Sequence, residues 1–240
     1  LVPDGYHAGG WLLLINGVQS SHVIGGQPRM LDFEYMRWIA AVLDSHIQTH
    51  LNPDKLRITH LGGGACSLAR YCADVYPNSR NTVVELDAKL AEYVREWFDI
   101  PKSPRVKIRV GDAGTVTRSF APASRDVVIR DVFAVDKTPA ELTSVDFVRT
   151  VDNSLAPGGL YILNCGDDRA LNAARAEAAA LLEVFEYVSI VADSAMLKGR
   201  RRGNVILAGS HAPLPQLGSA EAASISRVLM GGGVPAQYWD

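Results

Sequence analysis

The chain has 240 residues and a formal net charge of −2, a near-balance that argues against a nucleic-acid or anionic-membrane partner. Hydrophobic residues make up 48% of it, as in ordinary globular proteins, and the apolar stretch WLLLI at 11–15 is too short to span a membrane. Three cysteines (Cys66, Cys72 and Cys165) without a CxxC pair indicate reduced thiols, so we expect a cytoplasmic protein without disulfides.

The N-terminal part of the chain shows a hairpin pattern followed by a helix pattern. Two apolar stretches flank Asn16 and Gly17, a pair that favours a tight hairpin turn because both residues tolerate positive φ. We therefore predict a β-hairpin over 9–24. Apolar residues then recur at spacings of three and four over 31–51, which predicts an amphipathic helix capped by Asp32.

Strand patterns alternate with helix patterns over the next 150 or so residues, which is typical of parallel strands joined by crossover helices in a doubly wound sheet. The last two strands follow one another without a helix, so we expect an antiparallel hairpin at one edge. The expected strands are 55–61, 81–86, 105–110, 125–131, 158–165, 185–192 and 204–209. The expected helices are 65–76, 88–98, 113–119, 140–154 and 168–183.

We divide the chain into three parts. Residues 1–30 form an N-terminal hairpin segment, and residues 31–210 form a Rossmann-like nucleoside-binding catalytic domain. Residues 211–240 form a tail rich in Pro, Gly, Ala and Ser, within which we expect one helix at 219–230.

Glycine and acidic residues follow three successive strands, at the edge where an open parallel sheet binds its ligands. Gly62, Gly63 and Gly64 let the backbone turn sharply beside a ligand. Glu85 ends the next strand, where it can accept hydrogen bonds from both ribose hydroxyls. Asp112 follows the third strand, where it can accept from an exocyclic adenine amine. Together they predict an adenosine site, although the glycines could form an ordinary turn and the acids could be helix caps.

The glycine turn lacks the third glycine of the NAD fingerprint G-x-G-x-x-G, because Ala65, Cys66 and Ser67 follow it. An S-adenosyl ligand has no pyrophosphate and does not need that cradle. The antiparallel terminal hairpin also suits the S-adenosylmethionine-dependent fold. We therefore expect a seven-stranded, mostly parallel sheet of the methyltransferase-like Rossmann type.

Six motifs in the same order make the chain resemble the spermidine synthase (aminopropyltransferase) family, in a divergent bacterial branch. LLLINGVQ resembles the family's LVLDGVIQ, LDFEYMRWI its DEFSYHEML, HLGGGAC its IGGGDG, VELD its VEID, VGDAG its VGDG, and RDVVIRDVFA its YDVIIVDSSDP. The resemblance implies an enzyme of polyamine biosynthesis that transfers an aminopropyl group from decarboxylated S-adenosylmethionine, a co-substrate and not a permanently bound cofactor, to a small-molecule amine acceptor. It also implies a homodimer.

The resemblance further implies roles for single residues. The residues that it places against the nucleoside are Gln19, Gly62, Gly63, Gly64, Glu85, Asp112 and Ala113. Tyr35 would border the amine acceptor. Asp131 would orient and deprotonate the attacking amine, which is protonated near neutral pH unless a base accepts its proton.

Two acids of the family pattern are missing from the chain. Ala65 stands where GGGDG has an acid that pairs with the donor ammonium, and Ala134 stands where DSSDP has its second acid. Met36 replaces the polar residue after Tyr35. A buried ammonium without a partner commonly costs several kcal/mol. Two alternatives therefore stay open: an S-adenosylmethionine-dependent methyltransferase, whose donor keeps its carboxylate, and a degenerate domain that only binds a nucleoside.

Three further features of the sequence are explained by structure and not by a separate function. The basic run KGRRRGN at 198–204 has no interleaved aromatic residues, so we interpret it as a solvated hairpin tip and predict no nucleic-acid partner. His22 and His60 have no second His, Cys or acid at metal-ligand spacing, so we predict no metal site. We interpret Cys66 as a small residue beside the ligand and not as a thiolate.

Overall fold

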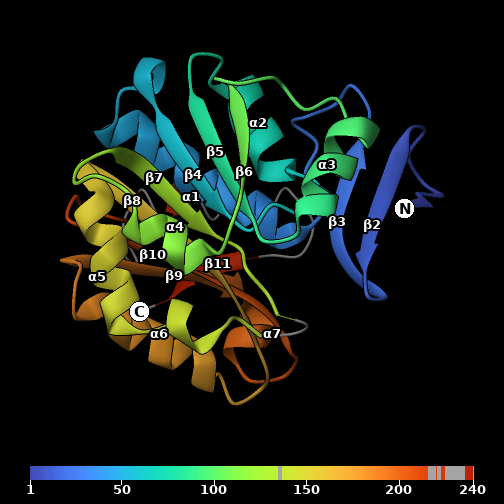
Figure 1. Ribbon diagram of the computed structural model, residues 1–240. Helices are drawn as coiled ribbons and strands as arrows, with labels where there is room; N and C mark the ends of the chain where they lie inside the picture. Colours follow the sequence, from blue (N-terminus) through green and yellow to red (C-terminus); the bar gives the residue numbers. More distant parts are fainter. Residues whose placement is uncertain (135–136, 216–219, 221–222, 225–235, 240) are drawn as a thin grey trace.

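The structure is a computed structural model that describes residues 1–134, 137–215, 220, 223–224 and 236–239. A twisted sheet flanked by helices fills most of the molecule, and a small sheet lies beside it at the N-terminal end (Figure 1). None of the helices in the described part of the chain has the length and apolar character needed to cross a bilayer.

The small sheet consists of β1 (Val2–Pro3), β2 (Gly10–Ile15) and β3 (Val18–Ile24). The predicted hairpin is confirmed: β2 pairs antiparallel with β3, and Asn16 and Gly17 have φ of 51° and 82° at the turn. The pairing shifts so that Leu13 faces Ser21 while Leu14 faces Gln19, which leaves Ser20 as the extra residue of a bulge. β1 was not predicted, because two residues carry no periodicity.

The large sheet confirms the predicted fold class, in the order β11-β9-β10-β8-β7-β4-β5-β6. Its parallel strands are β4 (Arg57–Leu61), β5 (Arg80–Glu85), β6 (Val106–Val110), β7 (Arg125–Arg130) and β8 (Leu155–Asp167). Its antiparallel members are β9 (Tyr187–Asp193), β10 (Gly203–Ser210) and β11 (Ala236–Trp239). The chain reverses its direction of travel across the sheet between β4 and β7, which creates a switch point for ligand binding.

Seven of these strands were predicted, and β11 is an eighth. It comes from the tail at 211–240 and pairs with β9 at the sheet edge. The predicted helix at 219–230 lies mostly outside the described residues. The division of the chain at residues 30 and 210 remains a prediction.

Helices cover both faces of the large sheet. Apolar residues of α1 (Glu34–His50) and α2 (Ser67–Val75) pack on one face, and α3 (Ala88–Trp97) joins α2 beside the N-terminal hairpin. The helices α4 (Ala113–Arg118), α5 (Val145–Ser154) and α6 (Asn172–Leu182) pack on the other face. Short 3-10 turns occupy Pro53–Lys55 and Ala140–Leu142, and α7 (Ser194–Leu197) precedes the basic run.

The predicted cap of the first helix is wrong. The helix begins at Glu34, its N-cap residue is Phe33, and no side chain caps it. Asp32 lies one residue too early for a capping bond. The predicted helix at 140–154 is also divided, because Ser144 leaves the helical conformation and caps α5 by accepting from the N–H of Phe147 at 3.2 Å.

Candidate functional site

A cavity of about 1580 Å³ opens at the carboxyl ends of the parallel strands, and the N-terminal hairpin and the start of α1 also line it. Every site residue predicted from the sequence contributes to its lining. These residues are Gln19, Tyr35, Gly62, Gly63, Gly64, Glu85, Asp112, Ala113 and Asp131. The fold therefore gathers residues up to 112 positions apart in the sequence around one cavity. The volume of this cavity exceeds the roughly 300–1,000 Å³ of a typical ligand pocket.

The glycine loop at 62–64 is shaped by close backbone contacts. A Cβ at Gly62, where φ is +91°, would lie 2.1 Å from the carbonyl oxygen of Asp131. A Cβ at Gly64, where φ is +46°, would lie 2.5 Å from Ser21 Oγ. Only glycine satisfies both positions. The loop is thus fitted between Asp131, which follows β7, and the N-terminal hairpin.

Glu85 fastens this loop to the end of β5. Its Oε2 accepts from the N–H groups of Gly63 at 3.0 Å and Gly64 at 3.3 Å, and its Oε1 accepts from the N–H of Asp87 at 2.9 Å. A carboxylate has about four lone-pair sites, so acceptor capacity remains for a ribose. This loop-holding role was not predicted from the sequence, because it follows only from the folded geometry.

Asp112 is the N-cap residue of α4. A helix cap was one of the two roles that the sequence allowed for it. Its Oδ1 accepts from the N–H of Thr115 at 2.7 Å. That backbone hydrogen bond, followed by the Thr115 side chain, lowers the pKa of the Asp112 carboxyl. Asp112 is exposed in the cavity lining and stays ionised at neutral pH, so it can still accept from a ligand amine.

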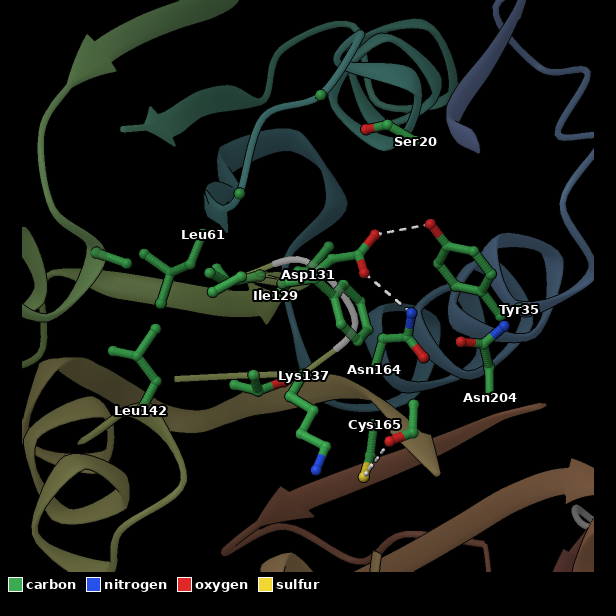
Figure 2. A pocket seen from close by; sticks show the side chains of 18 of the residues that line it. Ser20, Tyr35, Leu61, Ile129, Asp131, Lys137, Leu142, Asn164, Cys165 and Asn204 are labelled. Carbon is green, nitrogen blue, oxygen red and sulfur yellow. Dashed lines mark hydrogen bonds between the residues drawn. The ribbon is translucent and has the colours of Figure 1, made fainter. Parts of the chain in front are cut away.

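Asp131 follows β7 and is held by two donors (Figure 2). Tyr35 Oη donates to Asp131 Oδ2 at 2.9 Å, and Asn164 Nδ2 donates to Asp131 Oδ1 at 2.9 Å. Burial raises the pKa of Asp131, while the bonds from Asn164 and Tyr35 act in the opposite direction. Burial, with the adjacent Asp131 charge, raises the pKa of Tyr35 well above its usual value, so its hydroxyl remains a donor.

Asn164 was not predicted, although it lies on β8 next to Asp131. Its partnership with Asp131 spans 33 residues and leaves no periodic signal in the sequence. Its Oδ1 is buried and has no hydrogen-bond partner among the described residues. Since the Nδ2 group is committed to Asp131, the amide orientation is fixed by that bond.

A buried ion pair lies directly behind Asp131. Arg130 is fully buried and its Nη2 lies 2.6 Å from Glu177 Oε2 of α6. Arg130 Nη1 also donates to the carbonyl oxygen of Leu142 at 2.8 Å. Burial raises the pKa of Glu177, and the charge of Arg130 opposes that shift. The pair ties the end of β7, next to Asp131, to α6.

The two positions at which the spermidine synthase pattern has an acid, Ala65 and Ala134, carry no charge in this chain. Ala65 is fully buried, and its N–H donates to Ser21 Oγ at 3.0 Å. Ala134 is exposed and forms an isolated bridge with Lys137, whose ammonium lies in the cavity lining (Figure 2). A cation therefore lies in the loop where the family pattern has an acid.

The structure agrees with the interpretation of Cys66 and corrects that of the basic run at 198–204. Cys66 is buried, and burial raises the pKa of its thiol to about 12, so it is not a thiolate. His60 is buried against Asn81, with Nε2 3.0 Å from Oδ1. The basic run is more than a solvated tip, because Arg201 pairs with Asp193 at 2.6 Å and lines the cavity.

The chain is similar to known proteins in fold and in sequence. No protein-family model matches the chain. A crystal structure of a probable spermidine synthase from Corynebacterium glutamicum is 60% identical, with a TM-score of 0.96, and the match covers 100% of this chain and 86% of that one.

Curated relatives match shorter stretches. The eEF1A lysine and N-terminal methyltransferase of Mus musculus is 33% identical over 128 residues, which are 49% of this chain and 18% of that protein. The polyamine aminopropyltransferase of Vibrio vulnificus is 25% identical over 149 residues, which are 61% of this chain and 48% of that protein. The chain thus spans less than half the length of these curated relatives.

Proposed function

Since the chain belongs to the spermidine synthase family, we propose that it transfers an aminopropyl group from decarboxylated S-adenosylmethionine to a small-molecule amine. The observation that carries the proposal is the Asp131 carboxylate, partly desolvated and held by Tyr35 and Asn164 in the lining of the cavity. A base in this state is poised to accept a proton from an amine at the same site.

The proposed step is a direct displacement at carbon. Asp131 accepts a proton from the ammonium of the acceptor, and the freed nitrogen lone pair attacks the propyl carbon bound to sulfur. The carbon–sulfur bond breaks, its electron pair stays on sulfur, and methylthioadenosine leaves as a neutral thioether. Tyr35 and Asn164 hold the carboxylate so that its position does not depend on the acceptor.

We assign the nucleoside to the part of the cavity beside the glycine loop. Glu85 would accept from the ribose hydroxyls while it holds the loop amides, and Asp112 would accept from the adenine amine. Gln19 is exposed on β3 and lines the same space, as does Ala113. The glycine loop presents no side chain here, so the sulfonium side of the donor can approach the backbone.

A methyltransferase is the second candidate, and it rests on a separate observation. The buried Ala65 provides no carboxylate for a donor ammonium, and Lys137 adds positive charge to the lining. Intact S-adenosylmethionine carries a carboxylate that such a cation could pair with. The methyltransferase among the curated relatives is similar over about half of this chain.

One experiment separates these candidates. The purified protein is incubated with decarboxylated or intact S-adenosylmethionine and a panel of mono-, di- and triamines, and the products are identified by mass spectrometry. We expect aminopropylated amines and methylthioadenosine with the decarboxylated donor. Methylated products with the intact donor would replace the proposal by the second candidate. Binding of methylthioadenosine without any product would leave a nucleoside-binding domain.

We also propose that the protein is a cytoplasmic homodimer. Apolar side chains of the hairpin are partly exposed, among them Trp11, Leu14, Ile15 and Val18. A second copy could cover this surface. All three cysteines are free, which suits a reducing compartment. Light scattering after gel filtration tests the dimer, and Val18→Lys should shift the mass toward the monomer.

A further inference from the structure

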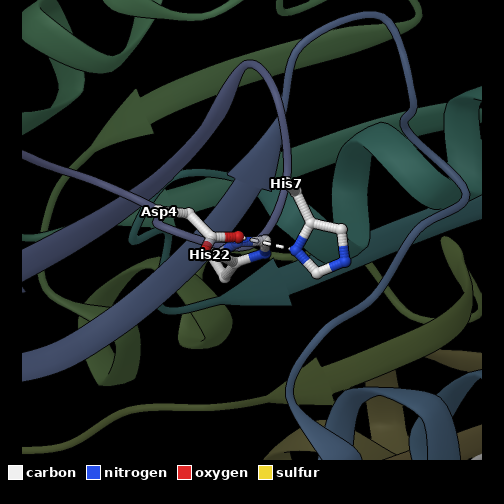
Figure 3. A group of neighbouring side chains, drawn as sticks. All are labelled: Asp4, His7 and His22. Atoms are coloured by element: carbon white, nitrogen blue, oxygen red, sulfur yellow. Dashed lines mark hydrogen bonds and ion pairs between the residues drawn. The ribbon is translucent and has the colours of Figure 1, made fainter.

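The N-terminal segment carries a cluster of metal-ligating side chains apart from the cavity (Figure 3). Asp4, His7 and His22 each contribute one oxygen or nitrogen atom, and these atoms lie within 4.8 Å of one another. Asp4 Oδ2 lies 2.6 Å from His7 Nδ1 and 2.9 Å from His22 Nε2. A single carboxylate oxygen is thus shared by two imidazole rings from separate parts of the chain.

The backbone holds this cluster in shape. The N–H of Asp4 donates to the carbonyl oxygen of Gly10 at 2.8 Å, and the N–H of Gly10 donates to that of His7 at 2.9 Å. A Cβ at Gly10 would lie 2.8 Å from both Cβ and Oδ2 of Asp4, so the carboxylate packs where no side chain fits. Asp4 Oδ1 accepts from the N–H of Tyr6 at 2.8 Å, which aims Oδ2 at the imidazoles.

We propose that Asp4, His7 and His22 bind a divalent transition-metal ion of the zinc class. Two imidazole nitrogens and one carboxylate oxygen are a donor set that such ions prefer. A tetrahedral zinc ion with bonds of about 2.0–2.2 Å keeps its ligand atoms about 3.3 Å apart. Asp4 Oδ2, which lies 2.6 Å from His7 Nδ1 and 2.9 Å from His22 Nε2, would therefore move away from them by about 0.7 and 0.4 Å. The side chain of His7 is 42% exposed, which leaves room for water as a further ligand.

The surroundings of His22 set the expected affinity and the role of the ion. His22 Nδ1 is buried without a hydrogen-bond partner among the described residues, so this ligand lacks the outer acceptor that usually strengthens a zinc site. We therefore expect binding weaker than that of a fully supported site, by roughly 10–100-fold. The carbonyl oxygen of His22 accepts from Ser67 Oγ at 2.9 Å. The bound ion would thus tie the segment at 4–10 to the strand that contacts α2.

The test uses protein without a histidine tag, stripped with a chelator and then titrated with Zn²⁺ or Co²⁺. We expect roughly one equivalent of bound ion, a rise in the thermal midpoint, and visible Co²⁺ absorption of a low-symmetry site. His7→Gln should weaken binding at least about tenfold, because it removes a direct ligand from an exposed position. Asp4→Asn should do the same by removing the charged ligand.

His211→Gln is the matched control. His211 Nε2 lies 3.0 Å from Asp152 Oδ1 in an exposed pair, and among the described residues no third ligating side chain joins the two. We expect this variant to bind the ion like the unmodified protein. The proposal is overturned if the unmodified protein binds no more ion than His7→Gln does, or if His211→Gln loses the ion equally. Should Asp4→Asn unfold, His7→Gln decides alone.

Discussion

The two ends of the cavity are built in different ways. At the glycine loop, the contacts join backbone amides to a carboxylate 21 or 22 residues away, within one strand–helix–strand unit. At Asp131, the contacts join side chains that are 33 and 96 residues apart and come from three elements. The first arrangement follows from a local motif, whereas the second exists only when the whole sheet and α1 have assembled.

The difference extends to charge. Near the glycine loop, Glu85 and Asp112 are partly or fully exposed. Behind the other end, Arg130 and Glu177 are buried beside Asp131. Charges are costly to bury and strongly coupled when they are buried. We therefore expect substitutions at the glycine loop to change mainly ligand affinity, and substitutions at the Asp131 end to change mainly rate and stability.

The largest expected effect is on the rate of Asp131→Asn. The substitution keeps the shape and one acceptor but removes the base, so turnover should fall by at least about 10²-fold. Methylthioadenosine affinity, measured by calorimetry, should change less than about threefold, because Glu85 and Asp112 are unaltered. A variant with near-normal turnover at neutral pH would remove Asp131 from the mechanism.

The next effect is on the stability of Glu177→Leu. Loss of the carboxylate leaves the Arg130 charge buried without its partner, so the free energy of unfolding should fall by about 3–5 kcal/mol. Chemical denaturation measures it. The double variant Arg130→Met, Glu177→Leu should recover much of the loss. Glu183→Leu is the control, since Glu183 meets Arg149 at 3.8 Å on the surface and exposed pairs contribute only about 0–1 kcal/mol.

Sequence reasoning succeeded where the signal is local. The hairpin turn at Asn16 and Gly17, the alternation of strands and helices, and the glycine loop each follow from residue type and spacing. It failed where the partner is distant or the element is short. β1 and β11 are two and four residues long, and Arg130 meets Glu177 only through the packing of α6 on the sheet.

Sequence reasoning also failed at three single residues, whose roles depend on contacts between segments or on the exact start of a helix. Asn164 lies in the last part of the apolar strand β8, where a polar residue signals function only if its neighbour Asp131, after β7, is known. His22 was judged to lack metal partners because the spacing along the chain was considered. The fold instead places Asp4 and His7 next to it. Asp32 was assigned as a cap because the helix start was set one residue too early.

A smaller effect is expected on affinity at the other end of the cavity. Glu85→Ala removes charge-assisted hydrogen bonds, each commonly worth about 1.5–3 kcal/mol, so methylthioadenosine binding should weaken at least about tenfold. The thermal midpoint of the free protein should also fall, since the amides of Gly63 and Gly64 lose their acceptor. Glu92→Ala, at an exposed position on α3, should leave both quantities unchanged. Unaltered binding in Glu85→Ala would place the nucleoside elsewhere.

The smallest expected effect is a shift in pH dependence. The base must be ionised to accept a proton, so activity should be lost as pH falls through the pKa of Asp131, which burial has already raised. Tyr35 donates to this carboxylate and favours its ionised form. Tyr35→Phe should therefore raise that pKa further and move the acid limb of the rate profile to higher pH.

The signature of Tyr35→Phe is that the loss depends on pH. Turnover should fall by up to about tenfold on the acid side, which is the effect of one hydrogen bond, and should approach that of the unmodified protein at alkaline pH. Tyr76→Phe is the matched control, because Tyr76 also donates to a half-buried carboxylate, Asp44 at 2.7 Å, but does not line the cavity. A loss equal at every pH would mean that Tyr35 orients the acceptor and leaves the proton affinity of Asp131 unchanged.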